Sequence, residues 1–193
     1  MFIDYLTLFM ADIVAGIGLL LYFLIYGLEK DDISPYAPAF FGVGLLGLLA
    51  GIHMVYTWPL PGVHNIVFGE PMVLFGIVFI AAAFAAYKNY DLMPVTIVAA
   101  FAGIYAIILS YAIFKYGITK HPNISALSYF GAGLTGLLSP FVWKFRNNKL
   151  VKTLGIILLA LTLLAWLSTM WGSLTGHSNP AGSFGKWKPF PMR

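Results

Sequence analysis

Residues 5–28 read YLTLFMADIVAGIGLLLYFLIYGL, a run in which Asp12 is the single charged side chain. A helix needs about 20 apolar residues to cross the hydrocarbon core of a bilayer, so this run is long enough to do so. No basic leader precedes it, and it extends well beyond the apolar segment of a signal peptide. The stretch therefore predicts a retained membrane helix.

Five further apolar runs follow, separated by short polar or proline-rich breaks. They cover residues 38–58, 71–88, 93–117, 124–143 and 150–174. The chain of 193 residues is 60% hydrophobic and 9% charged, whereas a soluble domain carries about 25% charged residues. We therefore predict an all-α fold, a polytopic bundle of six transmembrane helices in a lipid bilayer. Residues 1–177 form this single domain, and residues 178–193 form a short basic and aromatic tail.

Composition also excludes several kinds of chemistry. Cysteine is absent, which removes disulfides, thiolate metal sites, iron–sulfur clusters and cysteine nucleophiles. No basic stripe suggests nucleic acid as a partner. No catalytic sequence pattern is present, so we predict no catalytic residues and a non-enzymatic role.

The turn between the fifth and sixth runs carries Lys144, Arg146, Lys149 and Lys152. Short loops rich in Lys and Arg stay in the cytoplasm, so both termini are predicted to lie outside. Six spans also place all four histidines, Asp4, Asp12 and Glu70 in one half of the membrane or in the loops on that side. This placement on one side depends only on the number of spans, so it holds whichever way the protein is inserted.

The second and fifth runs share a glycine-rich sequence. Residues 41–50 and 130–139 are identical at seven of ten positions, with one copy in each three-helix half. One interpretation is an inverted repeat of the kind found in transporters. The other is close helix packing through small residues. The glycines predicted to pack are Gly42, Gly44, Gly47, Gly51, Gly131, Gly133 and Gly136.

Five polar residues are candidates for binding a ligand. They are Asp12, His53, His64, Asn65 and Glu70. Ionisable groups inside a membrane are costly and often functional. A metal site would use His53, His64 and Glu70, although their spacing matches no familiar ligand pattern. The alternatives are a polar pocket for a small ligand, headgroup, quinone or ion, and ordinary interfacial groups bonded to neighbours or water.

The most informative segment of the sequence runs from Trp58-Pro59-Leu60-Pro61-Gly62 through Asn65-Ile66-Val67-Phe68-Gly69-Glu70-Pro71. Two prolines and two glycines among apolar residues predict irregular backbone, with Glu70 and Pro71 opening the third helix. Such backbone is tolerated at membrane depth only where protein buries it or it lines a cavity.

With Leu74-Phe75-Gly76, this segment resembles the signature of a family of predicted archaeal and actinobacterial six-span membrane proteins of unknown function. The resemblance implies a self-standing fold and draws attention to Asn65, Gly69, Glu70 and Pro71. It carries over no reaction. The histidines are not part of the signature, which weakens the metal interpretation.

The favoured functional hypothesis is a non-catalytic subunit, or a component that binds a small ligand, in a larger membrane assembly, with a respiratory complex as one candidate. Other membrane subunits or a second copy of the chain are its predicted partners. A small inverted-repeat transporter and a metal-dependent membrane enzyme with an outward His/Glu site are the alternatives. Whether a metal, haem or quinone is bound stays open.

Overall fold

A computed structural model describes residues 4–182, which form six α-helices and no strand. The helices are α1 (Tyr5–Tyr26), α2 (Ala37–Thr57), α3 (His64–Tyr87), α4 (Met93–Tyr116), α5 (Pro122–Lys144) and α6 (Lys149–His177), with a short 3-10 turn (Ser34–Tyr36) before α2. Each of the six is long and apolar enough to cross a membrane. The predicted all-α, six-helix architecture is therefore confirmed, and its six candidate spans indicate a multi-pass membrane protein.

One helix start differs from the sequence prediction. Helix α3 begins at His64, so Glu70 lies within the helix and does not open it. Pro71 is inside the helix, where it cannot donate the backbone hydrogen bond that the Val67 carbonyl would normally accept. The Tyr129 hydroxyl of α5 donates to that carbonyl at 2.8 Å. The helix continues through the proline because a neighbouring helix satisfies the freed group.

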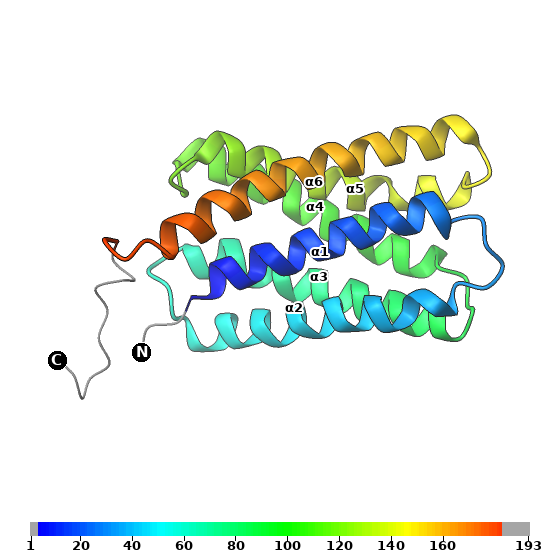
Figure 1. Ribbon diagram of the computed structural model, residues 1–193, viewed down its shortest axis with the longest axis horizontal. Coiled ribbons are helices and arrows are strands. Elements are labelled where there is room, and N and C mark those ends of the chain that lie inside the picture. Colours follow the sequence, from blue (N-terminus) through cyan, green and yellow to red (C-terminus); the bar gives the residue numbers. More distant parts are fainter. Residues whose placement is uncertain (1–3, 183–193) are drawn as a thin grey trace.

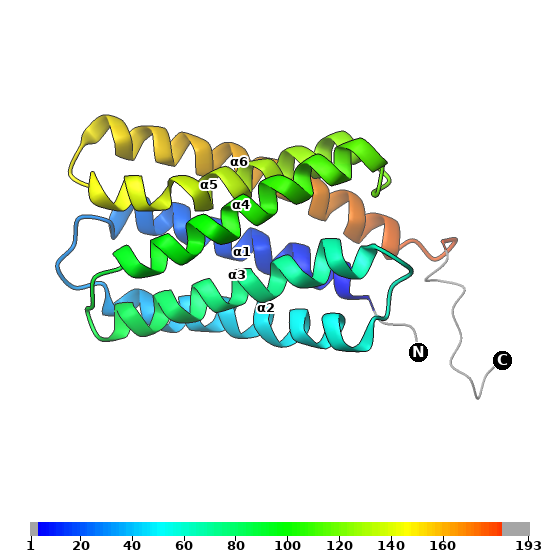
Figure 2. The same ribbon diagram turned by 180° about the vertical axis from the view of Figure 1, so that it is seen from behind.

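The six helices form a ring in chain order (Figures 1 and 2). Each helix packs antiparallel against the next, and α6 returns to pack against α1. One end of the ring carries both ends of the described chain and the loops 58–63 and 118–121, and we call it the histidine end. The other carries the turns 27–33, 88–92 and 145–148, and we call it the basic end. The orientation of these two ends across the membrane stays a prediction.

Two neighbouring pairs, α2–α3 and α4–α5, pack closely through glycine. A methyl group added at Gly44 would lie 2.7 Å from the Ile80 backbone nitrogen, and one added at Gly103 would lie 2.5 Å from the Leu137 nitrogen. Such distances leave no room for any side chain. Gly42 does not take part, because it is about half a helical turn from Gly44 and has nothing within 4 Å.

The same glycines bear on the inverted repeat. In such a repeat α2 corresponds to α5, α3 to α6 and α1 to α4. Gly44 of α2 packs on α3, but its counterpart Gly133 packs on α4, which is not the equivalent helix. Gly47 and Gly136 do reach equivalent helices, α1 and α4. Close packing accounts for the shared sequence directly, and the inverted repeat stays a prediction.

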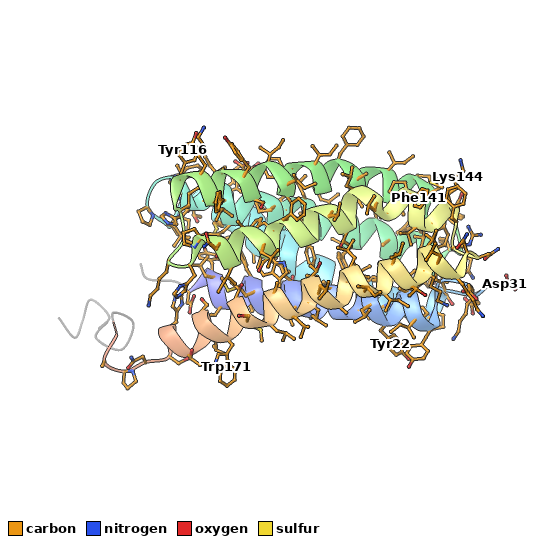
Figure 3. The ribbon with its side chains drawn as sticks, turned by 90° about the horizontal axis from the view of Figure 1, so that it is seen from above. Tyr22, Asp31, Tyr116, Phe141, Lys144 and Trp171 are labelled. Atoms are coloured by element: carbon orange, nitrogen blue, oxygen red, sulfur yellow. The ribbon has the colours of Figure 1, made fainter. Side chains whose placement is uncertain are left out.

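Large apolar side chains cover the outside of the ring. Tyr22 and Trp171 point away from the bundle in Figure 3 and are 54% and 71% exposed. A soluble monomer rarely exposes so continuous an apolar surface, whereas lipid tails are its natural neighbours. The outer surface is therefore suited to a bilayer.

Candidate functional site

The histidine end is tied together by hydrogen bonds between helix termini. Asp4 precedes α1 and accepts from the Thr7 hydroxyl at 2.9 Å and the Thr7 backbone nitrogen at 3.3 Å, which caps the helix. Its other contact is with Nδ1 of His177, the last residue of α6, at 3.0 Å. The first and last helices are thereby joined at this end.

His53 lies one turn before the end of α2 and pairs with α1. The Tyr5 hydroxyl is hydrogen-bonded to His53 Nδ1, and the two rings are stacked with their centroids 5.5 Å apart. The Thr57 hydroxyl donates to the His53 carbonyl at 2.7 Å. His53 thus has an internal partner on the neighbouring helix.

Asn65 organises the loop between α2 and α3. Trp58 ends α2 in the left-handed conformation (φ 47°), and the chain then turns through Pro59 to Val63. The fully buried Asn65 amide accepts from the Leu60 backbone nitrogen at 2.9 Å, and donates to the carbonyls of Leu60 at 2.5 Å and Gly62 at 3.2 Å. Its side chain supplies hydrogen bonds that an irregular loop at membrane depth would otherwise lack.

His64 bridges the two loops of this end. Its Nδ1 lies 2.8 Å from the Pro61 carbonyl, and its Nε2 lies 3.2 Å from the Ile118 carbonyl at the end of α4. Both partners only accept. A neutral imidazole carries one N–H and can donate to one of them, whereas the protonated ring can donate to both.

Glu70 pairs across the α3–α4 contact. The Tyr105 hydroxyl donates to a Glu70 carboxylate oxygen, and both side chains are half-buried. A carboxylate one and a half turns inside α3 thus has a partner from the middle of α4. The acidic group of the signature segment therefore connects two helices.

Asp12 differs from the other four candidates. It is 5% exposed on α1, and its Oδ2 atom is buried without a hydrogen-bond partner in the part of the chain that the structure describes. The space beside it is provided by Gly47 of α2, where an added methyl group would lie 3.0 Å from that oxygen. Among the five candidates, this carboxyl has no internal partner within residues 4–182.

The structure does not bring the five candidates into one site. No hydrogen bond or ion pair joins any two of them within residues 4–182. No group of three His, Asp or Glu side chains in this range could hold a metal ion. The metal interpretation thus gains no ligand set from the described residues.

A cavity of about 550 Å³ lies inside the ring, in the half nearer the basic end. All six helices contribute to its wall, although α2 does so only through Phe40. Tyr129 and Trp166 close it near mid-membrane, with ring centroids 5.3 Å apart. Leu138, Phe141 and Leu154 line it and are between 39% and 56% exposed, so the cavity opens to the surroundings near the basic end.

The lining is apolar because its polar groups are already bonded within the protein. The six lining side chains that carry a hydrogen-bond donor are Thr96, Tyr129, Thr135, Ser139, Trp143 and Trp166. The three Thr and Ser hydroxyls donate to backbone carbonyls of their own helices at 2.7 to 2.9 Å. Tyr129 donates to Val67, Trp143 to Asp91 and Trp166 to Ser128, at 2.7 to 2.9 Å. No side-chain donor is left to face a ligand.

Polar contacts also fix the turns at the basic end. Lys152 of α6 pairs with Glu29 after α1 at 2.8 Å. Asp91 accepts from the Met93 backbone nitrogen at 3.0 Å and from the Trp143 indole at 2.7 Å. These two hydrogen bonds, the Met93 N–H first, hold the pKa of the Asp91 carboxyl below its ordinary value.

Small residues on one face of α4 are a sequence signal for this cavity. Helix α4 carries Ala99, Ala102, Gly103 and Ala106, which share a face at helical spacing and all line the cavity. Small residues leave space where large ones would fill it. In a helix that is apolar all round, however, nothing in the sequence distinguishes a lipid-facing alanine from one that faces a cavity.

The basic and aromatic part of the predicted tail, residues 184–193, lies outside the described residues. A comparison with protein families matches residues 1–179 to the family described as protein of unknown function DUF981. The chain belongs to this family. The match covers all six helices and includes the signature segment. Comparisons with curated proteins and with solved structures gave no match.

Proposed function

We propose that this protein binds one membrane-derived amphiphile, with its single apolar chain in the ring cavity and an anionic head at the basic end. This develops the ligand-binding role expected from the sequence. Membership of a larger assembly stays a prediction. The observation that carries the proposal is the cavity itself, whose side-chain donors are all bonded internally.

The size of the cavity supports an occupant. A volume of about 550 Å³ falls within the range of about 300–1,000 Å³ typical of small-molecule sites. The cavity also opens to the surroundings near the basic end, so a molecule from the membrane can reach it.

The chemistry of the lining supports an apolar chain in particular. Water in a protein interior needs two to four polar partners, and this wall offers no free side-chain donor. The hydrogen-bond acceptors of a polar ligand would lose their water partners without replacement, because no side-chain donor of the wall is free. An alkyl or isoprenoid chain loses nothing on entering such a site.

The charge at the opening supports an anionic head. The exposed lining residue Phe141 lies one turn before Lys144, and Arg146 follows with its guanidinium 4.6 Å from the Trp143 ring centre. The chain between α5 and α6 carries no acidic residue of its own. A carboxylate or phosphate head at this position would meet cations while its chain entered the cavity.

Photolabelling tests the proposal. The purified full chain is reconstituted in phosphatidylcholine vesicles with a long-chain fatty acid that carries a diazirine in its chain, and cross-links are mapped by mass spectrometry. We expect cross-links to lining residues that an excess of unmodified fatty acid removes. Cross-links confined to outward-facing residues, or insensitive to competition, would overturn the cavity site.

Matched variants sharpen this test. Ala102→Phe adds a ring to the cavity wall on α4, whereas Ile104→Phe adds one to the outer face of the same helix, where Ile104 is 42% exposed. We expect the first to reduce cavity labelling severalfold and the second to leave it unchanged. An alkylamine probe of equal chain length should label less. Equal labelling by acid and amine would refute the anionic head and leave the apolar-chain site standing.

A further inference from the structure

Asp12 of α1 is not one of the residues that line the cavity. Its carboxyl lies about 10 Å along α1 from the histidine end, at 1.5 Å per residue. A methyl group added at Gly47 would lie 3.0 Å from Asp12 Oδ2 and 3.2 and 3.3 Å from the apolar side chains of Phe75 and Met72 of α3. Phe75 and Met72 also line the cavity. The carboxyl is thus enclosed between α1, α2 and α3.

An unpaired carboxylate at this depth is expensive, because no hydrogen bond or ion pair within residues 4–182 compensates its charge. A hard metal cation would need several oxygen ligands. No group of three potential ligand side chains exists among residues 4–182, and no other polar group bonds to Asp12 there. A proton needs only one oxygen.

We propose that Asp12 is a proton-binding site, held as a neutral carboxylic acid in the α1–α2–α3 contact and exchanging its proton with the histidine end. This site is independent of the apolar ligand. Ionisation of the acid must admit water to the contact or move α1 away from Gly47, so the packing of the first helix depends on this proton.

The titratable groups on the helices around Asp12 have other partners toward the histidine end. On α1 and α2, the Tyr5 hydroxyl is hydrogen-bonded to His53. Asp4 contacts His177 of α6, and Glu70 of α3 bonds to Tyr105. None of them bonds to Asp12 within the described residues. The Tyr5–His53 pair joins α1 and α2, the two helices that meet at Asp12 and Gly47, so this pair is the proposed exchange point.

Infrared spectroscopy tests the protonation directly. The full chain in vesicles near neutral pH should show a carbonyl stretching band of a protonated carboxylic acid, shifted by ¹³C-labelling of aspartate. Asp12→Asn should remove the band, and Glu70→Gln should leave it. A spectrum in which the ¹³C-sensitive acid band is absent, or survives in Asp12→Asn, would overturn the proposal.

Glycine variants test the position of the acid without removing it. Gly47→Ala places a methyl group 3.0 Å from Oδ2 and should shift the band, whereas Gly42→Ala on the same helix meets open space and should not. This pair also serves if Asp12→Asn fails to fold. An identical band in Gly47→Ala and wild type would contradict the assigned place.

A hydrophobic carbodiimide provides a second readout. The acid O–H adds across one C=N bond: the carboxyl oxygen bonds to the central carbon and the proton goes to nitrogen. Acyl migration to nitrogen then gives a stable acylurea with nothing lost. We expect Asp12 to gain the mass of one carbodiimide, at a rate that falls as pH rises. No adduct on Asp12, or a rate independent of pH, would count against a protonated acid.

Discussion

The hydrogen bond from Tyr129 to the Val67 carbonyl should stabilise the bundle. Pro71, four residues after Val67, has no N–H to donate to this carbonyl. Pro71 leaves that carbonyl without its helical partner, and the Tyr129 hydroxyl replaces it at 2.8 Å. Tyr129→Phe keeps the ring against Trp166 and removes only the donor. A buried carbonyl left unsatisfied costs about 1–3 kcal/mol, and hydrogen bonds between membrane helices average about 0.6 kcal/mol with a maximum of about 1.7. We expect a loss of about 1–1.5 kcal/mol.

The reasoning is tested by a double-mutant cycle with Pro71→Ala. An alanine at position 71 has an N–H that can donate to the Val67 carbonyl, so this carbonyl no longer depends on α5. In that background, Tyr129→Phe should cost less than about 0.5 kcal/mol. Free energies of unfolding come from reversible SDS titration in mixed micelles followed by circular dichroism. Tyr56→Phe, at a residue 83% exposed, is the matched control and should be neutral.

Two outcomes would refute this account. An equal loss on Tyr129→Phe in the wild-type and Pro71→Ala backgrounds would show that the hydroxyl does not substitute for the missing backbone donor. A neutral Tyr129→Phe in the wild type would show that the carbonyl is satisfied in another way.

Two further predictions concern helix packing and the basic end. Gly103→Ala places a methyl group 2.5 Å from the backbone of α5 and should destabilise the bundle by about 1–3 kcal/mol in the same titration, while Gly42→Ala should not destabilise it. For Asp91, hydrogen bonds from Met93 and Trp143 lower the folded-state pKa, so its charged form stabilises the fold above the unfolded-state pKa. This contribution is lost as pH falls through the lowered value. Unfolding midpoints of wild type and Asp91→Asn should therefore differ at neutral pH and converge in acid; a constant difference would contradict this.

Much of the architecture could be predicted from the sequence because span length is set by bilayer thickness. The six spans, their alternating directions and the gathering of the histidines at one end all follow from counting apolar runs. The predicted start of α3 at Glu70 and Pro71 is wrong. A proline usually marks the beginning of a helix, and only the Tyr129 hydroxyl, which donates to the Val67 carbonyl, lets the helix continue through Pro71. That donor lies 62 residues away in the sequence.

The candidate site was less predictable. The sequence makes Asp12 and Asn65 candidates for binding a ligand, but their surroundings could not be inferred from it. Asn65 bonds its own loop, whereas Asp12 faces a glycine on another helix. The cavity was missed because membrane helices are apolar on every side, so the sequence carries no amphipathic pattern that tells the inner face from the outer one.

The closure of the ring by α1 and α6 has a consequence for the order of assembly. Helix α1 is synthesised before α6, yet the two helices pack together and are tied at both ends, through Asp4–His177 and Glu29–Lys152. Until α6 is inserted, the inner face of α1 has lipid in place of its final neighbour. The cavity therefore lacks one wall throughout synthesis of the first five helices, and a lipid chain already lying there can be enclosed when the sixth arrives.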